Sequence, residues 1–209
     1  MPNIIGFLFF FLAIQLSAQS DFKPLVNKSD FTKKFSEASA KINTIKSDFT
    51  QEKHLSMLEE KIVSKGVFWF KKEQKVRMEY SSPTKYLIVM NDKTFRIKDD
   101  SGDKKMATGG NKLFQQISQI TADCIRGNVL NNKDFATEVF ENSKQYRIEM
   151  KPLSKQMKNY FSSIHLMVNK SDLDVASIIM NEPSGDFTKL SFQNKQLNSN
   201  ISDEVFSVK

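Results

Sequence analysis

The stretch 66–83 contains a segment in which apolar side chains occupy both faces of one strand. A half-buried strand alternates apolar and polar residues, whereas residues 67–70, Val-Phe-Trp-Phe, follow one another without a polar residue. Both faces of this strand must therefore be covered. In a chain with little regular helix, one cover could be a lid or a bound apolar ligand. A lipid-like cargo is thus the first functional hypothesis.

The first residues predict a cleaved secretory signal. Ile4–Leu16 is an apolar run interrupted by Gln15, and the small-residue junction Ser17-Ala18-Gln19 follows it. The run is shorter than the roughly 20 apolar residues that span a bilayer, so a membrane anchor or a buried helix is the alternative. We expect residues 1–18 to be the signal peptide and residues 19–209 to form a single domain in an extracytoplasmic space.

The charge of the chain limits the classes of binding partner, and its cysteine content limits how the fold can be stabilised. The chain has 31 Lys and Arg against 24 Asp and Glu, a net charge of +7. This excess favours anionic lipid head groups or acidic partners, although an ordinary solvated surface explains it equally well. No dense basic cluster or recognition motif indicates nucleic acid binding. The single cysteine, Cys124, permits no internal disulfide, so stability must come from packing.

Hydrophobic periodicity predicts two amphipathic helices. The first is capped by Ser29 or Asp30 and presents one apolar face, formed by Phe31, Phe35, Ala38, Ile42 and Ile45. The second opens at Asn111, after a pair of glycines, and ends near Gly127. Its apolar face is formed by Leu113, Phe114, Ile117, Ile120 and Cys124.

A period of two predicts strands through most of the remaining chain. Short turns separate them, and neighbours in sequence are expected to pair as an antiparallel meander. In the strand with the most regular alternation, Ile148 and Met150 alternate with Arg147, Glu149 and Lys151, so one of its faces is exposed to solvent. The predicted strands are Lys46–Leu55, Lys61–Phe70, Lys75–Tyr80, Tyr86–Met90, Thr94–Lys98, Lys104–Thr108, Phe135–Phe140, Gln145–Lys151, Phe161–Asn169, Val175–Asn181 and Phe187–Asn194.

About ten or eleven antiparallel strands do not form one flat sheet, because strand twist makes a large sheet curl. We therefore expect a mainly β fold with an α lid (α+β). Its form is an unclosed antiparallel β-barrel whose concave apolar face is covered by helices. A filled β-sandwich with helices packed outside gives the same periodicity and stays open as the alternative.

The sequence carries no recognisable catalytic or metal-binding constellation. The two histidines, His54 and His165, fall at strand positions without residues at metal-ligand spacing. The acidic run Asp99–Asp103 lacks the ligand spacing of a calcium loop and is expected to be a hairpin turn. Cys124 falls on an apolar helix face, where a thiol is usually a small hydrophobe. We expect a protein that is not an enzyme and uses no metal or cofactor.

Several short motifs in series resemble the LolA-type carriers, which move lipoproteins across the periplasm of Gram-negative bacteria. They are Phe49-Thr50-Gln51, the block 66–72 (Gly-Val-Phe-Trp-Phe-Lys-Lys), Pro83, and the closing stretch 200–206 (Asn-Ile-Ser-Asp-Glu-Val-Phe). The predicted order of helix, strands, lid helix and strands is also similar over essentially the whole mature chain. The resemblance implies an unclosed barrel whose apolar face holds acyl chains beneath a lid.

The resemblance also implies where the acyl cavity lies. Alternation along the strand would turn Val76, Met78 and Tyr80 inward, with Arg77 and Glu79 outward. The full set assigned to the cavity is Phe68, Trp69, Val76, Met78, Tyr80, Leu87, Val89, Leu113, Phe114, Ile117 and Ile120.

A carrier of this family takes its cargo from an inner-membrane ATP-driven transporter and delivers it to an outer-membrane acceptor, without binding ATP itself. The resemblance therefore implies a periplasmic lipoprotein carrier that acts without catalysis, and a monomer is expected. Two alternatives stay open: a LolA-like carrier of another amphiphile, such as a glycolipid or a lipid-linked pigment precursor, and a structural envelope domain with a filled barrel.

One position departs from the family pattern. The family's arginine, two or three residues after the tryptophan, hydrogen-bonds the lid backbone, and its position falls at Lys72 here. Glu73 replaces the proline that often follows. A lysine has one compact ammonium group instead of a five-donor fork, so a lid latch at Lys72 is expected to be looser or absent.

Overall fold

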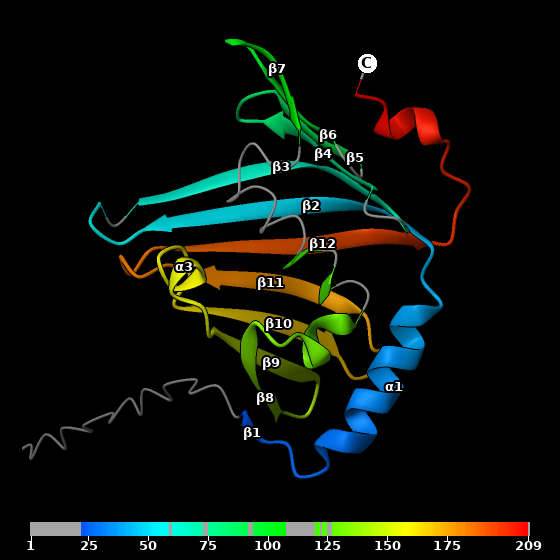
Figure 1. Ribbon diagram of the computed structural model, residues 1–209, viewed down its shortest axis with the longest axis vertical. Coiled ribbons are helices and arrows are strands. Elements are labelled where there is room, and N and C mark those ends of the chain that lie inside the picture. The colour runs from blue at the N-terminus through cyan, green and yellow to red at the C-terminus, as the bar shows by residue number, and fades with distance from the viewer. Residues whose placement is uncertain are drawn as a thin grey trace, which may run out of the picture.

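Twelve antiparallel strands form one curved sheet in the structure, which is a computed structural model (Figure 1). It describes residues 22–58, 60–72, 75–91, 94–107, 120, 121, 123, 124 and 127–208. The strand order is β1-β8-β9-β10-β11-β12-β2-β3-β4-β5-β6-β7, and the sheet is not closed into a full barrel. The predicted fold class, a mainly β fold built on an unclosed antiparallel barrel, is confirmed.

All strands pair with neighbours that run in the opposite direction. Every predicted strand is present, with differences confined to strand ends; β12, for example, continues to Leu197. The strands are β1 (Lys23–Pro24), β2 (Thr44–Leu55), β3 (Glu60–Lys71), β4 (Lys75–Ser82), β5 (Tyr86–Asn91), β6 (Thr94–Asp99), β7 (Gly102–Ala107), β8 (Phe135–Glu141), β9 (Gln145–Pro152), β10 (Ser163–Asn169), β11 (Val175–Asn181) and β12 (Phe187–Leu197).

The helix α1 (Lys28–Ala40) crosses one end of the sheet (Figure 1). Its cap is Asn27, whose side-chain oxygen accepts a hydrogen bond from the Asp30 backbone N–H at 3.1 Å, so the prediction of Ser29 or Asp30 was wrong. Asn, Ser and Asp are comparably good caps, which is why residue type did not decide among them. The helix also ends before Ile42, and Ile45 belongs to β2.

Three short elements complete the described part of the chain. The helix α3 (Lys155–Lys158) lies between the predicted strands Gln145–Lys151 and Phe161–Asn169, and the Ser154 hydroxyl caps it by accepting from Met157 N at 3.2 Å. The 3₁₀ helices are η2 (Asn128–Asn131) and η3 (Asp203–Phe206). Within the described residues, no helix is both long and apolar enough to cross a membrane.

The buried apolar side chains of the sheet's inner side form two clusters. In the first, Phe31 and Phe35 of α1 pack with side chains of β8–β11 and with Ile120, Cys124 and Val129. The second joins β2–β6 and β12 around fully buried aromatic side chains, among them Phe49, Phe68 and Phe70. Helix α1 thus packs on the β8–β11 part of the sheet at one end, and large aromatic residues fill part of the β2–β6 half.

The outer face of β3–β5 carries a third, smaller cluster. Here Trp69, Leu87 and Val89 pack against Ile201 and Phe206 of the C-terminal segment. That segment lies beside β4 and β5 (Figure 1). The doubly apolar strand is therefore covered on this face by the protein's own C-terminal segment, and the assignment of Trp69, Leu87 and Val89 to the acyl cavity was wrong.

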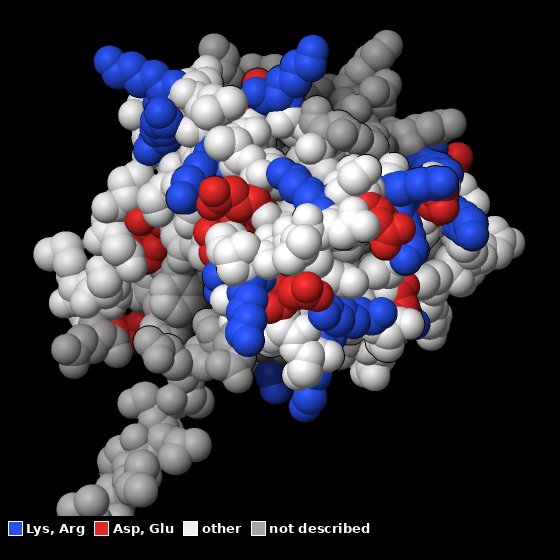
Figure 2. Space-filling view, turned by 90° about the horizontal axis from the view of Figure 1, so that it is seen from below, with Lys and Arg blue, Asp and Glu red and all other residues white. Residues whose placement is uncertain are grey.

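Charged side chains of both signs are interspersed over the face shown in Figure 2. On β8, β9 and the turn after β10, Arg147 pairs with Glu149 at 2.9 Å and Lys170 with Glu141 at 2.5 Å. Such partly exposed pairs contribute little to stability. The basic excess of the chain is not gathered into a single-sign patch on this face.

Candidate functional site

A cavity of about 620 Å³ opens between the two halves of the sheet. This volume lies within the range of about 300–1,000 Å³ that ligand sites occupy. Strands β2, β4, β5, β11 and β12 supply most of its wall, and the segment after α3 supplies Asn159, Tyr160 and Phe161. The remaining lining residues are Gln51, Lys53, Val76, Met78, Tyr80, Tyr86, Ile88, Thr121, Met180, Glu182, Pro183, Ser184, Thr188 and Leu190.

The wall is polar at one end and apolar at the other. Lys53 is paired in register with Thr188, and the next inward position pairs Gln51 with Leu190. The same change from polar to apolar runs from Glu182, directly after β11, to Met180 on β11. Because alternate residues of a strand face the same side, each strand contributes a short polar-to-apolar series. An amphiphile with one polar end and one apolar chain matches this gradient.

The opposing strands show the same gradient. Tyr80 and Tyr86 face each other near the polar end, with ring centroids 5.5 Å apart. Met78, Val76 and Ile88 follow further inward on β4 and β5. Burial raises the pKa of both phenols, so the two hydroxyl groups stay protonated at neutral pH.

A glycine shapes the wall beneath Tyr80. Gly66 is paired with both Phe49 and Tyr80, and the Phe49 and Tyr80 rings meet edge-on with centroids 4.9 Å apart. A Cβ atom on Gly66 would lie 2.9 Å from the Phe49 ring. The Tyr80 hydroxyl then donates to Gln51 Oε1 at 2.9 Å. The motifs Phe49-Thr50-Gln51 and Gly66 are therefore parts of one wall.

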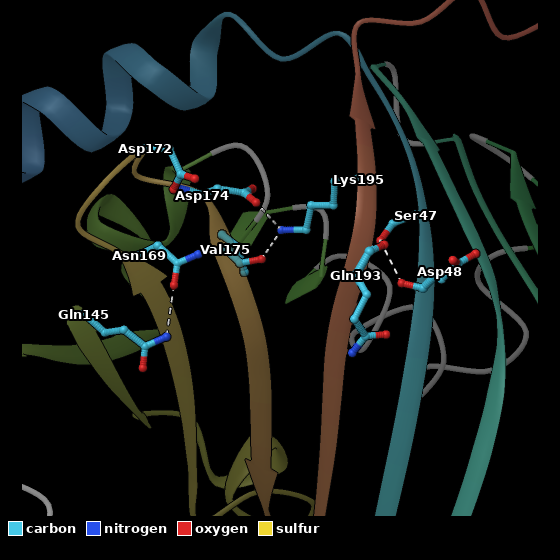
Figure 3. A network of polar contacts seen from close by, with 9 residues as sticks. All are labelled: Ser47, Asp48, Gln145, Asn169, Asp172, Asp174, Val175, Gln193 and Lys195. Carbon is cyan, nitrogen blue, oxygen red and sulfur yellow. Dashed lines mark hydrogen bonds and ion pairs between the residues drawn. The ribbon is translucent and has the colours of Figure 1, made fainter.

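A polar network lies toward the opposite end of the strands, near α1 (Figure 3). Lys195 Nζ donates to Asp174 Oδ2 at 2.7 Å and to the carbonyl oxygen of Val175. The same ammonium lies 5.3 Å from the centre of the Phe192 ring. Burial lowers the pKa of Lys195, and the hydrogen bond to Asp174 opposes this shift.

The void beside Lys195 is only about 10 Å³, enough for about one water molecule. It is lined by Ser39 of α1 and by apolar side chains that include Ile42 and Leu173. The ligand-sized cavity lies toward the other end, where the β11–β12 turn supplies Pro183 and Ser184 to its wall.

Exposed apolar side chains lie at the tip of the β2–β3 hairpin, next to the polar end of the cavity. Met57 is 93% exposed and Leu58 is 62% exposed. Ser56 joins this tip to the β11–β12 turn, because its backbone N–H and its hydroxyl both donate to Asp186 Oδ1, at 2.8 and 2.9 Å. The tip therefore lies beside the cavity wall, to which Ser184 of the same turn belongs.

The family model described as "Outer membrane lipoprotein carrier protein LolA" matches residues 40–209. The chain belongs to the LolA family. No curated protein matches the chain. Family membership accounts for the order of elements around the cavity, and members of the family are binding or carrier proteins of the cell envelope.

Solved structures show the same fold at low sequence identity. The LolA superfamily protein NE2245 of Nitrosomonas europaea is 13% identical over 84% of this chain and 97% of that chain, with a TM-score of 0.50. An uncharacterized conserved protein of Thermus thermophilus is 8% identical over 85% and 91%, with a TM-score of 0.51. MucB of Pseudomonas aeruginosa, in its complex with MucA, is 11% identical over 85% of this chain and 59% of that chain, with a TM-score of 0.50.

The structure brings together only some of the residues assigned to the cavity. Val76, Met78 and Tyr80 line it, and Phe68 lies on the same side of the sheet, fully buried in the β2–β6 cluster. Ile120 is buried against α1, next to the cavity residue Thr121. Leu113, Phe114 and Ile117, the other predicted lid residues, lie outside the described part of the chain.

Lys72 contacts a helix, but not the one assigned to the LolA lid. Its Nζ donates to the carbonyl oxygen of Ala40 at 2.8 Å, at the C-terminus of α1. A cation at this end of a helix satisfies a free carbonyl and matches the helix dipole. Arg77, on the neighbouring strand β4, donates to Val205 O at 3.1 Å on the outer face. A role for Lys72 in latching stays a prediction.

The cysteine and the two histidines are held in packing contacts and do not form a catalytic or metal-binding group among the described residues. Cys124 is fully buried, as predicted for a small hydrophobe, and burial raises the pKa of its thiol. His54 stacks on Phe187 with ring centroids 4.3 Å apart. Burial lowers the pKa of His165, whereas neighbouring Glu149 raises it. Among the residues that the structure describes, no group of three His, Cys, Asp or Glu could hold a metal ion.

Two parts of the cavity wall were not predicted from the sequence. Gln51 belonged to a recognised motif but was not assigned a place in the site, and its register opposite Leu190 is what places it there. The segment 159–161, just before and at the start of the predicted strand Phe161–Asn169, was not assigned to the site, yet it supplies Tyr160 and Phe161 to the wall. Gln51 takes its place through a pairing between strands that are distant in sequence, whereas Tyr160 and Phe161 follow α3 and donate backbone hydrogen bonds to Met157 O.

Proposed function

We propose that this protein is a periplasmic carrier that binds the acyl chains of lipoproteins and shuttles them from the inner to the outer membrane. The observation that carries the proposal is the 620 Å³ cavity whose wall changes from Lys53 and Glu182 at one end to Val76 and Ile88 at the other. This cavity supports a carrier over a structural domain with a filled barrel. Membership of the LolA family supports lipoproteins as the cargo.

The mechanism is reversible burial without catalysis. Each methylene that leaves water for an apolar site contributes about 0.8 kcal/mol, so a long acyl chain leaves a membrane only for a dry, matching surface. Met78 and Met180 offer flexible side chains that adapt to chains of different shape. The polar end, with Lys53 and Glu182 3.6 Å apart, leaves the head of the cargo near solvent.

We propose that residues 1–18 direct the chain to the periplasm of a Gram-negative bacterium and are then removed. There the carrier receives its cargo from an ATP-driven inner-membrane transporter and passes it to an outer-membrane acceptor. The exposed side chains Met57 and Leu58, beside the cavity opening, supply a contact surface for these partners. A monomer leaves the opening accessible to both.

A binding experiment tests the proposal. The purified, delipidated protein is loaded with a fluorescent fatty-acyl probe and titrated with a synthetic triacylated lipopeptide, with the same peptide lacking acyl chains as the control. We expect the acylated peptide to displace the probe and the bare peptide to leave it in place. Displacement by the bare peptide would indicate a peptide-binding protein, a relevant outcome since MucB was solved with a protein, MucA.

Absence of probe binding, or displacement by free glycolipids but not by the lipopeptide, would also contradict the proposal. The second result would indicate a LolA-like carrier of another amphiphile.

A further inference from the structure

Gln51 is a side-chain amide of the cavity wall and lies at the boundary between the polar and apolar parts of that wall. Along β2 the inward-facing series runs from Lys53 through Gln51 to Phe49, that is, from a charge through an amide to an aromatic ring. Gln51 is flanked in register by Leu190, an apolar side chain that also lines the cavity. Gln51 is partly buried and faces the cavity, so its side-chain amide can hydrogen-bond to the protein or to a molecule in the cavity.

Tyr80 provides the hydrogen-bond donor for the oxygen of the Gln51 side-chain amide. The Tyr80 hydroxyl donates to Gln51 Oε1 at 2.9 Å, and burial raises the pKa of Tyr80, so the hydroxyl keeps its proton. The position of the Tyr80 ring is itself fixed by the edge-on contact with Phe49. This bond orients the amide and leaves its Nε2 group, with two N–H donors, without a protein partner among the described residues.

We infer that the Gln51 Nε2 group donates a hydrogen bond to the carbonyl oxygen of an acyl ester or amide in the bound cargo. This inference rests on the proposed carrier function and specifies how the cargo is positioned. The carbonyl is where an acyl chain joins its polar head, and Gln51 lies where the polar wall meets the apolar wall. The tail then extends along Met78, Val76 and Ile88, and the head lies near Lys53 and Glu182.

A ligand pair that differs only at the carbonyl tests this assignment. Palmitoyl lysophosphatidylcholine carries an ester, and its hexadecyl ether analogue has the same head and chain length without the carbonyl. Both are used to displace a fluorescent fatty-acyl probe from the wild-type protein and from Gln51→Met, which keeps the side-chain length but has no N–H donor. The matched control is Gln193→Met, the same change at an exposed position of β12.

We expect the ester-to-ether affinity ratio to be about five-fold higher in the wild type and in Gln193→Met than in Gln51→Met. One hydrogen bond of about 1 kcal/mol corresponds to that factor. Gln51→Glu provides a second test, because it keeps the oxygen that accepts from Tyr80 and replaces the donor nitrogen. It should lose the ester preference as well, so failure of one variant to fold leaves the other informative.

The possible results separate this inference from the function on which it rests. Equal ratios in the wild type and in both Gln51 variants, with normal binding of the probe, would overturn the carbonyl assignment and leave the carrier function intact. Failure of the wild-type protein to bind the probe and both amphiphiles would overturn the carrier function, and the assignment with it.

Discussion

Gly66 lies directly against Glu79, so closely that a Cβ atom at residue 66 would be 2.1 Å from the Glu79 carbonyl oxygen. The register between β3 and β4 shifts at this point, between Lys65 and Gly66. The close approach of the two strands lets Phe49 and Tyr80 meet across the glycine. One residue without a side chain thus determines the shape of the cavity wall.

Gly66→Ala should destabilise the protein by about 2–4 kcal/mol, because the added methyl meets strand backbone and a buried ring in a close-packed region. Chemical denaturation measures the change in the free energy of unfolding. Lys65→Ala, at the exposed neighbouring position, is the control and should stay within about 0.5 kcal/mol of the wild type. A Gly66→Ala variant as stable as the control would show that the two strands separate easily here.

Met57 and Leu58 allow cargo transfer to be separated from cargo binding. The double variant Met57→Ser/Leu58→Ser removes the exposed apolar surface of the hairpin tip without touching a residue that lines the cavity. It should bind a fluorescent acyl probe with unchanged affinity and deliver lipoprotein to outer-membrane vesicles at least several-fold more slowly. Val26→Ser, a change at another fully exposed apolar residue, serves as the control. A delivery rate equal to that of the wild type would show that the hairpin tip is not part of the contact surface.

Lys72→Leu should loosen the end of α1, since it removes the hydrogen bond from Nζ to Ala40 O. Phe35 of α1 packs in the same buried cluster as Ile120 and Cys124. Loosening α1 is therefore expected to weaken the packing of Ile120 and Cys124. We expect weaker retention or trapping of cargo, measured as a change in the release rate of an acyl probe. Lys72→Arg should restore wild-type rates, and release rates equal in all three proteins would exclude a latch.

Asp203 should make the attachment of the C-terminal segment dependent on pH. Lys71 and Lys75 lie 2.7 and 3.1 Å from its carboxylate, and their hydrogen bonds lower the pKa of Asp203. A carboxyl with a lowered folded pKa stabilises the folded state above its unfolded pKa of about 3.9, and this contribution is lost as the pH falls through the folded value.

Trp69, the single tryptophan, packs against this segment and reports on it by fluorescence. The wild-type emission should shift as the segment loosens below about pH 4, the usual carboxyl range. Asp203→Asn should show a loosened segment already at neutral pH and a smaller change on acidification. Identical titration curves for the two proteins would show that the ion pairs do not hold the segment.

The alternation of apolar and polar residues predicted the strands and placed Val76, Met78 and Tyr80 on one face, and these three residues, assigned to the acyl cavity through the LolA resemblance, line the cavity of the structure. It did not predict which face of the doubly apolar strand borders the cavity. Trp69 and Phe68 are both apolar, and Trp69 is covered by Ile201 and Phe206, which come from the far end of the chain. A contact of that kind is set by tertiary packing, which a local pattern does not record.

Gln51 illustrates the same difficulty for a polar residue. It stands in a polar run, Gln51 to His54, in which periodicity gives no sign of a buried side. Its place in the wall depends on its register with Leu190 and on the hydroxyl of Tyr80. Short elements were missed for a different reason, since β1 has only two residues and no period to detect.

The central claim is that the cavity holds the acyl chains of a lipoprotein. Its most direct test is to isolate the protein from its native envelope and identify the molecules that remain bound by mass spectrometry. Ile88→Trp, which places an indole in the apolar half of the cavity, is compared with Ile62→Trp, at an exposed position outside it. We predict triacylated lipoproteins with the wild type and with Ile62→Trp, and at least a ten-fold lower yield with Ile88→Trp. Recovery of only glycolipids or pigments, or an equal lipoprotein yield from all three proteins, would contradict the claim.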